Sequence, residues 1–204
     1  MTGKLEGFQS ISTNTSTNEY CKKQNTKNDP DNICTHCYSW TMLKTFRKNM
    51  APALERNSIL LNSKILHPDA LPVINQAFFR FNSHGELALD KKKATINLIN
   101  YINIAIKNPH CNFALWTKRF DIIKPYFDKN KKPKNFILVY SNPKINHIFK
   151  KPPTHFDKTF NNVYENIEVK KQNCTGQKCK DCLLCYKLDT TNTIVEKVKS
   201  YGKK

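Results

Sequence analysis

Seven of the eight cysteines in this 204-residue chain fall into two groups, one near each end. The N-terminal cysteine set is Cys21, Cys34 and Cys37; the C-terminal cysteine set is Cys174, Cys179, Cys182 and Cys185. The first 17 residues contain no apolar run typical of a secretion signal, and thiols of proteins that are not exported rarely form structural disulfides. We therefore interpret both sets as metal ligands or catalytic thiols.

The C-terminal set has the spacing C-x4-C-x2-C-x2-C. Four thiolates this close in the chain suit a [4Fe-4S] cluster, and ferredoxin-type sequences use similar spacings. Zinc usually takes two C-x2-C pairs separated by a longer loop, so a site formed by Cys34 and Cys37 with Cys182 and Cys185 is the alternative. A metal is predicted in both interpretations.

The N-terminal set offers three thiols, spaced C-x12-C-x2-C. Three cysteines bind three irons of a [4Fe-4S] cluster and leave the fourth iron open, and catalytic metal centres keep an open coordination position. Alternatively His36 or His67 supplies a fourth ligand and closes a structural zinc site. The eighth cysteine, Cys111, lies beside a predicted strand, and we expect it to be a small buried apolar residue.

Gly85 is the only glycine between Phe8 and Cys174. It follows the predicted strand 77–81, and its isolation favours a need for unusual backbone geometry or for close approach of a ligand. The alternative is an ordinary turn. Because ligands gather at the carboxyl ends of strands in parallel α/β proteins, the segment around Gly85 is a candidate site.

Arg80 lies within that strand and shares a face with Phe78. An arginine on an inward face is costly unless it meets an anion, so Arg80 is a candidate ligand for a substrate or a carboxylate. A solvent-facing edge position is the alternative. Two later predicted strands are also followed by polar residues. Lys118 follows strand 112–117 and is a second candidate ligand for a substrate. Ser141 and Asn142 follow strand 136–140.

The chain has 34 Lys and Arg residues against 16 Asp and Glu residues, a net charge of +18. This excess favours polyanionic partners, so RNA, DNA or a nucleotide is the first partner class to consider. The alternative is a solvated surface in a chain rich in Lys and Asn. No segment approaches the roughly 20 apolar residues of a membrane-spanning helix, so we expect no membrane contact.

Helices and short strands alternate in the middle of the chain, which predicts parallel βα units. Asp90 is predicted to cap a helix that ends near Lys107, and a shorter helix is predicted over 120–127. Residues 12–32 are polar and predicted to form a loop, whereas Pro52 begins a helix and 191–201 has a helical pattern. We expect two regions: residues 1–165, with a cluster-binding loop at about 12–40, and a cysteine-rich segment with a closing helix at 166–204.

These features resemble radical S-adenosylmethionine (SAM) enzymes, in which three cysteines hold a [4Fe-4S] cluster and SAM chelates the fourth iron. The resemblance rests on Cys34-Thr35-His36-Cys37-Tyr38 after a first strand and on a Gly-Glu after the second. It implies that His36 lies near the adenine, that His84-Gly85-Glu86 replaces the Gly-Gly-Glu motif at the SAM amino group, and that Ser141 and Asn142 face the ribose or carboxylate. The spacing differs from the usual C-x3-C-x2-C.

The chain also resembles a phage protein family called gene product 88, in segments that include residues 34–40, 80–87, 113–119 and 174–186. That family implies no substrate. Together the two resemblances imply an incomplete (β/α) barrel of radical-SAM type with a cysteine-rich C-terminal segment, holding two [4Fe-4S] clusters and SAM.

We therefore predict a small radical SAM-like enzyme with an electron donor such as flavodoxin or ferredoxin, in the cytoplasm (that of the host, for a phage protein). The first alternative is a non-enzymatic, zinc-binding basic protein that binds nucleic acid. The second is a degenerate barrel whose clusters serve structure or redox sensing.

Overall fold

A six-stranded parallel sheet forms the centre of the protein. The structure is a computed structural model that describes residues 3–164 and 172–198. Every strand pairs in parallel with the next one along the chain, so the spatial order equals the sequence order. The strands are β1 (Ser10–Ile11), β2 (Phe78–Phe81), β3 (Asn112–Thr117), β4 (Phe136–Ile145), β5 (Lys158–Val163) and β6 (Thr193–Lys197). In the described residues β1 and β6 do not pair, so the sheet is open, and the predicted α/β class with a parallel, unclosed sheet is confirmed.

Helices connect the first four strands. The α-helices are α1 (Glu19–Asn25), α2 (Tyr38–Lys44), α3 (Ala51–Ser63), α4 (Lys91–Lys107), α5 (Phe120–Phe127) and α6 (Cys179–Cys182). The described chain also has three short 3-10 helices: η1 (Gly3–Leu5), η2 (Lys48–Met50) and η3 (Pro68–Ala70). The Asp90 carboxylate accepts a hydrogen bond from the Lys93 N–H at 2.8 Å, which confirms the predicted cap of α4.

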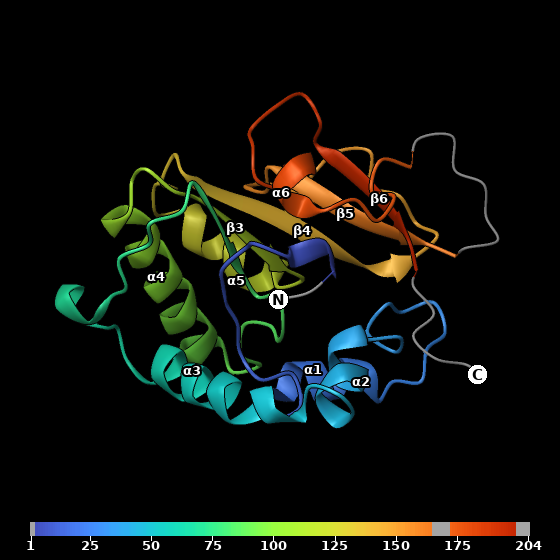
Figure 1. The fold of residues 1–204 in the computed structure, drawn as a ribbon, viewed down its shortest axis with the longest axis horizontal. Coiled ribbons are helices and arrows are strands. Elements are labelled where there is room, and N and C mark those ends of the chain that lie inside the picture. The colour runs from blue at the N-terminus through green and yellow to red at the C-terminus, as the bar shows by residue number, and fades with distance from the viewer. Residues whose placement is uncertain (1–2, 165–171, 199–204) are drawn as a thin grey trace.

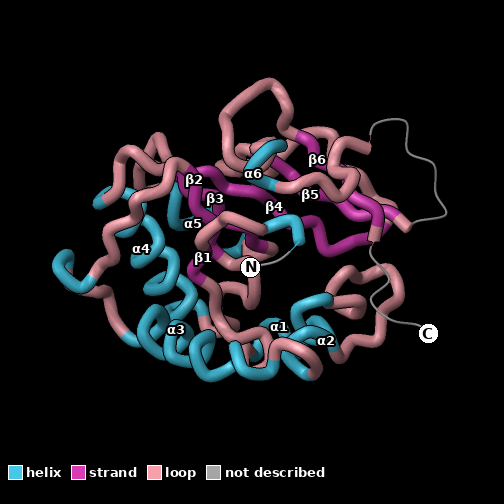
Figure 2. Tube along the Cα trace, viewed as in Figure 1, coloured by secondary structure: helices cyan, strands magenta, loops and turns pink. Residues whose placement is uncertain are grey.

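Both faces of the sheet are buried, as strands of a parallel sheet require. Phe113 and Leu115 of β3 point to one face and pack with apolar residues of α3, α4 and α5. Ala114 and Trp116 point to the opposite face and pack with Phe8, Tyr186 and other residues from the two ends of the described chain. Figure 1 shows α3 and α4 on one side of the strands and α6 on the other, and Figure 2 shows the same arrangement along the Cα trace.

Two predicted elements are wrong. The polar run 12–32 contains helix α1, because the Asn18 side chain accepts a hydrogen bond from the Cys21 N–H at 3.1 Å and starts a helix that apolar periodicity does not reveal. The predicted closing helix 191–201 is instead strand β6, whose β-branched Thr193, Ile194 and Val195 pair with β5. Residues 199–201 of that prediction lie outside the described residues.

The C-terminal segment is joined to the main sheet. Strand β6 pairs with β5 from Thr159↔Thr193 to Val163↔Lys197, and Cys174 forms an isolated bridge with Glu196. Cys185 and Tyr186 pack in the same apolar cluster as Ala114 of β3. The described C-terminal cysteines therefore lie over the face of the sheet that the long helices leave uncovered. In the described residues, none of the helices has the length and apolarity needed to cross a membrane.

Candidate functional site

A cavity of about 520 Å³ lies at the carboxyl ends of the strands and contains residues of both cysteine sets. Its walls come from α1 and α2, from the residues after β2, and from β3 to β6. Most of the site residues predicted from the sequence line it: Cys21, Cys34, His36, Cys37, Arg80, His84, Gly85, Glu86, Lys118, Ser141, Cys174, Cys179 and Cys185. The fold thus brings together residues that lie more than 150 positions apart in the chain.

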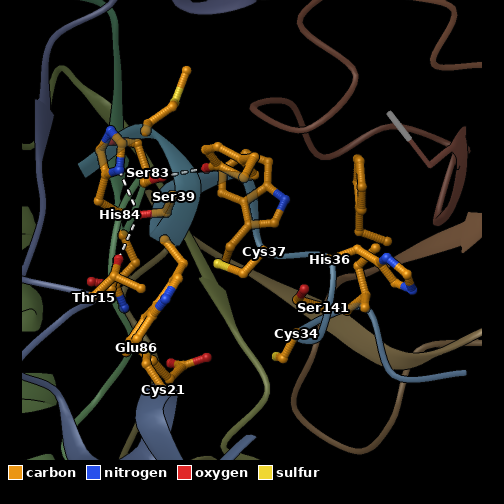
Figure 3. Close-up of a pocket in the computed structure, with 18 of the residues that line it drawn as sticks. Thr15, Cys21, Cys34, His36, Cys37, Ser39, Ser83, His84, Glu86 and Ser141 are labelled. Atoms are coloured by element: carbon orange, nitrogen blue, oxygen red, sulfur yellow. Dashed lines mark hydrogen bonds between the residues drawn. The ribbon is translucent and has the colours of Figure 1, made fainter. Parts of the chain in front are cut away.

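The N-terminal cysteine set is held by local hydrogen bonds of its backbone. Cys21 lies in the first turn of α1, the Cys34 N–H donates to Asn32 Oδ1 at 2.9 Å, and Cys37 is the cap residue of α2. All three are free thiols, and Figure 3 shows them around one part of the pocket, with Glu86 close to Cys21. Desolvation by burial raises the pKa of Cys21 and of Cys34, and the other thiols of the set act in the same direction. Buried thiols of this kind become thiolates when a cation compensates their charge.

Lys118 is a cation of the chain that favours the thiolate form of both Cys21 and Cys34. It follows β3, and its Nζ donates a hydrogen bond to Ser141 Oγ at 3.0 Å. Burial by itself lowers the pKa of Lys118, but Cys34 and Glu86 outweigh that effect and the pKa is raised. The lysine therefore stays charged beside the N-terminal cysteine set.

Glu86 is fixed by three donors that come from two parts of the chain. Its Oε1 accepts hydrogen bonds from Thr117 Oγ1 at 2.6 Å and from the Leu87 N–H at 2.9 Å, and its Oε2 accepts from the Lys118 N–H at 2.8 Å. The residue is 5% exposed and lines the cavity. The carboxylate thus has one orientation, set by the end of β3.

His84 is held by a chain of hydroxyl groups, and dashed lines in Figure 3 mark the hydrogen bonds from Thr15 to Ser39 and from Ser39 to His84. The Gly85 N–H donates to Thr15 Oγ1 at 2.8 Å, the Thr15 hydroxyl bonds to Ser39 Oγ, and Ser39 Oγ lies 2.7 Å from His84 Nδ1. Because a backbone N–H can only donate, each hydroxyl is free to donate to the next atom, and Nδ1 accepts. Burial, followed by the charges of Arg47 and Arg80, lowers the pKa of His84 from 6.5 to about 4.

We expect the depressed pKa of His84 to make the protein less stable in mild acid. Between pH 6.5 and 4 the unfolded chain binds a proton that the folded chain does not, so the free energy of unfolding falls as the pH falls. The His84 contribution is about 2 kcal/mol between pH 7 and pH 5. Urea unfolding followed by circular dichroism should show this loss in the wild type and a smaller one in His84→Gln. Equal losses in the two proteins would contradict the assignment.

Hydrogen-bond donors reach the sulfurs of the C-terminal cysteine set. Lys4 Nζ, which also pairs with Glu196, lies 3.1 Å from Cys174 Sγ, and Gln177 Nε2 lies 3.4 Å from Cys182 Sγ. Desolvation by burial raises the pKa of Cys179 and of Cys185, and Arg80 opposes that shift in both. N–H groups directed at cysteine sulfur stabilise thiolate charge and tune metal–thiolate centres.

The two cysteine sets form separate groups. The thiols that act on Cys21 and Cys34 belong to their own set, and those that act on Cys179 and Cys185 belong to the C-terminal set. In the described residues, no three His, Cys, Asp or Glu side chains converge as ligands of one metal ion. His67 does not line the cavity, and His36 Nε2 lies 3.1 Å from the Pro30 carbonyl oxygen.

Two predicted site residues lie outside the lining of the cavity. Asn142 is 1% exposed, and its amide nitrogen donates to the His147 carbonyl and to Asn161 Oδ1, which leaves no donor for a cofactor. Cys182 stays near its set through Gln177 without lining the cavity. Sequence reasoning missed Thr15, Ser39 and Trp116. Thr15 and Ser39 bond to the residues after β2, Trp116 contacts Arg80 from the neighbouring strand, and the one local signal is that Ser39 lies two residues after Cys37.

The comparisons identify a family for the chain. The model of the family described as gene product 88 matches residues 4–188, which include all members of both cysteine sets. A search of the curated proteins and a search of the solved structures each returned no match. Because the match covers about nine-tenths of the chain, the protein belongs to the gene product 88 family.

Proposed function

We propose that this protein is a small iron–sulfur enzyme of the radical SAM type. The N-terminal cysteine set would hold a [4Fe-4S] cluster with one open iron, and the C-terminal set would hold a second cluster. The observation that carries the proposal is the common cavity, because it places three free thiols, an ordered carboxylate (Glu86) and the C-terminal thiols around one space.

The donor chemistry fits an iron–sulfur cluster better than a single zinc ion. A structural zinc ion takes four ligands around one point, whereas the N-terminal set supplies three cysteines. The corners of a cluster accept thiolates that lie farther apart. The N-terminal set supplies three free thiols and the C-terminal set supplies four. Lys4 and Gln177 add N–H donors to the sulfurs of the C-terminal set.

The chain's own residues would orient SAM beside the open iron. Glu86, held by Thr117 and by the Lys118 N–H, is placed to accept from an ammonium group. Lys118 and Ser141 are a cation and a hydroxyl suited to a carboxylate or a ribose. His84 stays neutral at pH 7, so it adds no repulsion to a bound cation.

Bound at the N-terminal cysteine set, a [4Fe-4S] cluster would supply one electron to SAM, and this reductive chemistry would allow a hydrogen atom to be abstracted from the substrate. A low-potential one-electron donor such as flavodoxin or ferredoxin would provide the electron. The residues around the cavity would exclude water and position the substrate.

Reductive cleavage of SAM tests the proposal. Protein purified without oxygen should convert SAM to 5′-deoxyadenosine in the presence of dithionite, as measured by liquid chromatography. Cys37→Ser should reduce this product to the level of the protein-free control, because it removes one ligand of the open cluster. Cys111→Ala is the matched control: Cys111 is fully buried and outside the cavity, so this variant should retain the activity. Iron-loaded wild type without cleavage would contradict the proposal.

A further inference from the structure

Arg80 is a cation in the cavity that is paired with no carboxylate in the described residues. It is half-buried, it lines the cavity, and its Nε is buried without a hydrogen bond. In the described parts of the chain, none of the ion pairs involves Arg80. The groups that act on its charge are two tyrosines and two cysteines, namely Tyr186, Tyr38, Cys179 and Cys185. A guanidinium withdrawn from bulk water without an anion is costly, so its position calls for a partner.

The side chain is oriented by an aromatic ring. The Arg80 Cζ lies 4.0 Å from the centroid of the Trp116 ring on the neighbouring strand β3. A guanidinium stacked on an indole keeps its N–H groups at its edge, where they form a planar fork that matches the oxygens of a carboxylate or a phosphate. Trp116 therefore holds Arg80 ready for bidentate binding.

Two other cations of the cavity already have partners. Lys4 pairs with Glu196 and contacts Cys174, and Lys118 donates to Ser141 beside Glu86. Arg80 differs because none of the ion pairs in the described residues includes it and its Nε has no hydrogen-bond partner. It is thus suited to an anion that arrives from outside the chain.

The size and lining of the cavity limit the kind of molecule that can carry the anionic group. A volume of about 520 Å³ lies in the range of small-molecule sites. Apolar and aromatic side chains contribute to the wall, among them Leu5, Trp40, Phe46, Trp116 and Phe160. The space fits a small molecule with one charged end and an apolar or ring-shaped body.

We propose that the cavity binds a small substrate through an oxyanion group, a carboxylate or a phosphate, which the guanidinium of Arg80 holds beside the C-terminal cysteine set. That the bound molecule is a substrate rests on the proposed function, whereas the anion-binding site itself is inferred from Arg80 and Trp116 alone. The same cavity contains the N-terminal set, so the bound molecule would lie within reach of the proposed reaction.

Calorimetric titration of the full chain, purified without oxygen, tests the anion site. The probes are inorganic phosphate, pyrophosphate and succinate at constant ionic strength, with adenosine as an uncharged control. At least one anion should bind at one site, with a dissociation constant at least about tenfold higher in Arg80→Gln. Arg56→Gln, the same change at an exposed position of α3, should change it less than about twofold. The relative affinity for phosphates and succinate distinguishes the two oxyanions.

Arg80→Lys keeps the charge without the planar fork, so its affinity should lie between those of the wild type and Arg80→Gln. If Arg80→Gln does not fold, the difference between the wild type and Arg80→Lys decides the result. No anion binding by the wild type, or equal binding by all variants, would overturn the inference. So would loss of half the iron in Arg80→Gln with unchanged anion affinity, because Arg80 would then serve only the C-terminal metal centre. Cleavage of SAM by the wild type is measured separately and decides the proposed function.

Discussion

Cys34→Ala and Cys182→Ala are each expected to lose about half of the iron and acid-labile sulfide of the wild type, which should contain about eight of each. The reason is that the two residues belong to separate thiol groups: Cys34 interacts with Cys37, and Cys182 with Cys179 and Cys185. Removal of one ligand should leave the other cluster in place. The measurement is metal and sulfide analysis with a visible absorption spectrum on protein purified without oxygen.

The double variant Cys34→Ala/Cys182→Ala should lose nearly all iron, and Cys111→Ala should lose none, because Cys111 lies in the apolar core outside both groups. A colourless wild type with stoichiometric zinc and no sulfide would contradict the iron–sulfur assignment. That result would favour the alternative, a basic zinc protein whose nucleic-acid binding should weaken steeply with salt. Loss of all metal in either single variant would show that one centre spans both cysteine sets.

Gly85→Ala is expected to lower the free energy of unfolding by at least about 3 kcal/mol, or to prevent folding. The residue has φ +74°, and a Cβ built there would lie 2.1 Å from Thr13 Oγ1 and 2.6 Å from the Thr13 carbonyl oxygen. The backbone oxygen cannot move freely, because the Thr13 N–H donates to the His84 carbonyl at 3.2 Å and ties the two segments together. Urea unfolding followed by circular dichroism measures the effect.

Gly7→Ala is the matched control for the backbone strain. Gly7 has a similar φ of +80°, and a Cβ there meets only the flexible Lys180 side chain at 3.5 Å. Its cost should be about 1 to 2 kcal/mol, the penalty for an L-residue in the left-handed region. A loss in Gly85→Ala no larger than that in Gly7→Ala would show that Thr13 makes room for the methyl group.

Local signals in the sequence were sufficient for much of the fold. Asp90 caps the α4 helix as predicted, because an N-cap depends on neighbouring residues. The strand over 112–117 and the helix over 120–127 have the predicted bounds, since apolar runs and periodicity are properties of the segment itself. The need for a glycine at Gly85 and the burial of Cys111 were likewise predicted from the sequence.

Other features depend on residues that meet only in the folded chain. Residues 193–197 form a strand because β5 supplies the pairing partner, and a helical pattern in the sequence cannot report that partner. The predicted end of the third strand at residue 140 is wrong: β4 continues to Ile145 and contains Ser141 and Asn142, and the Asn142 amide donates to Asn161 instead of lining the cavity. Two of the three donors that orient Glu86, the Thr117 hydroxyl and the Lys118 N–H, lie at the end of β3, about 30 residues away.

The sequence by itself determined the two cysteine groups, their spacing and the family of the chain, because these depend on residue type and order alone. Only the tertiary structure decided that both groups share one cavity and that Arg80 stacks on Trp116 without an ion-pair partner in the described residues. The physical reason is that parallel strands bring their carboxyl ends to one edge of the sheet, whatever their separation in the chain. Packing and charge between such distant residues are set by the sheet register, which local patterns do not encode.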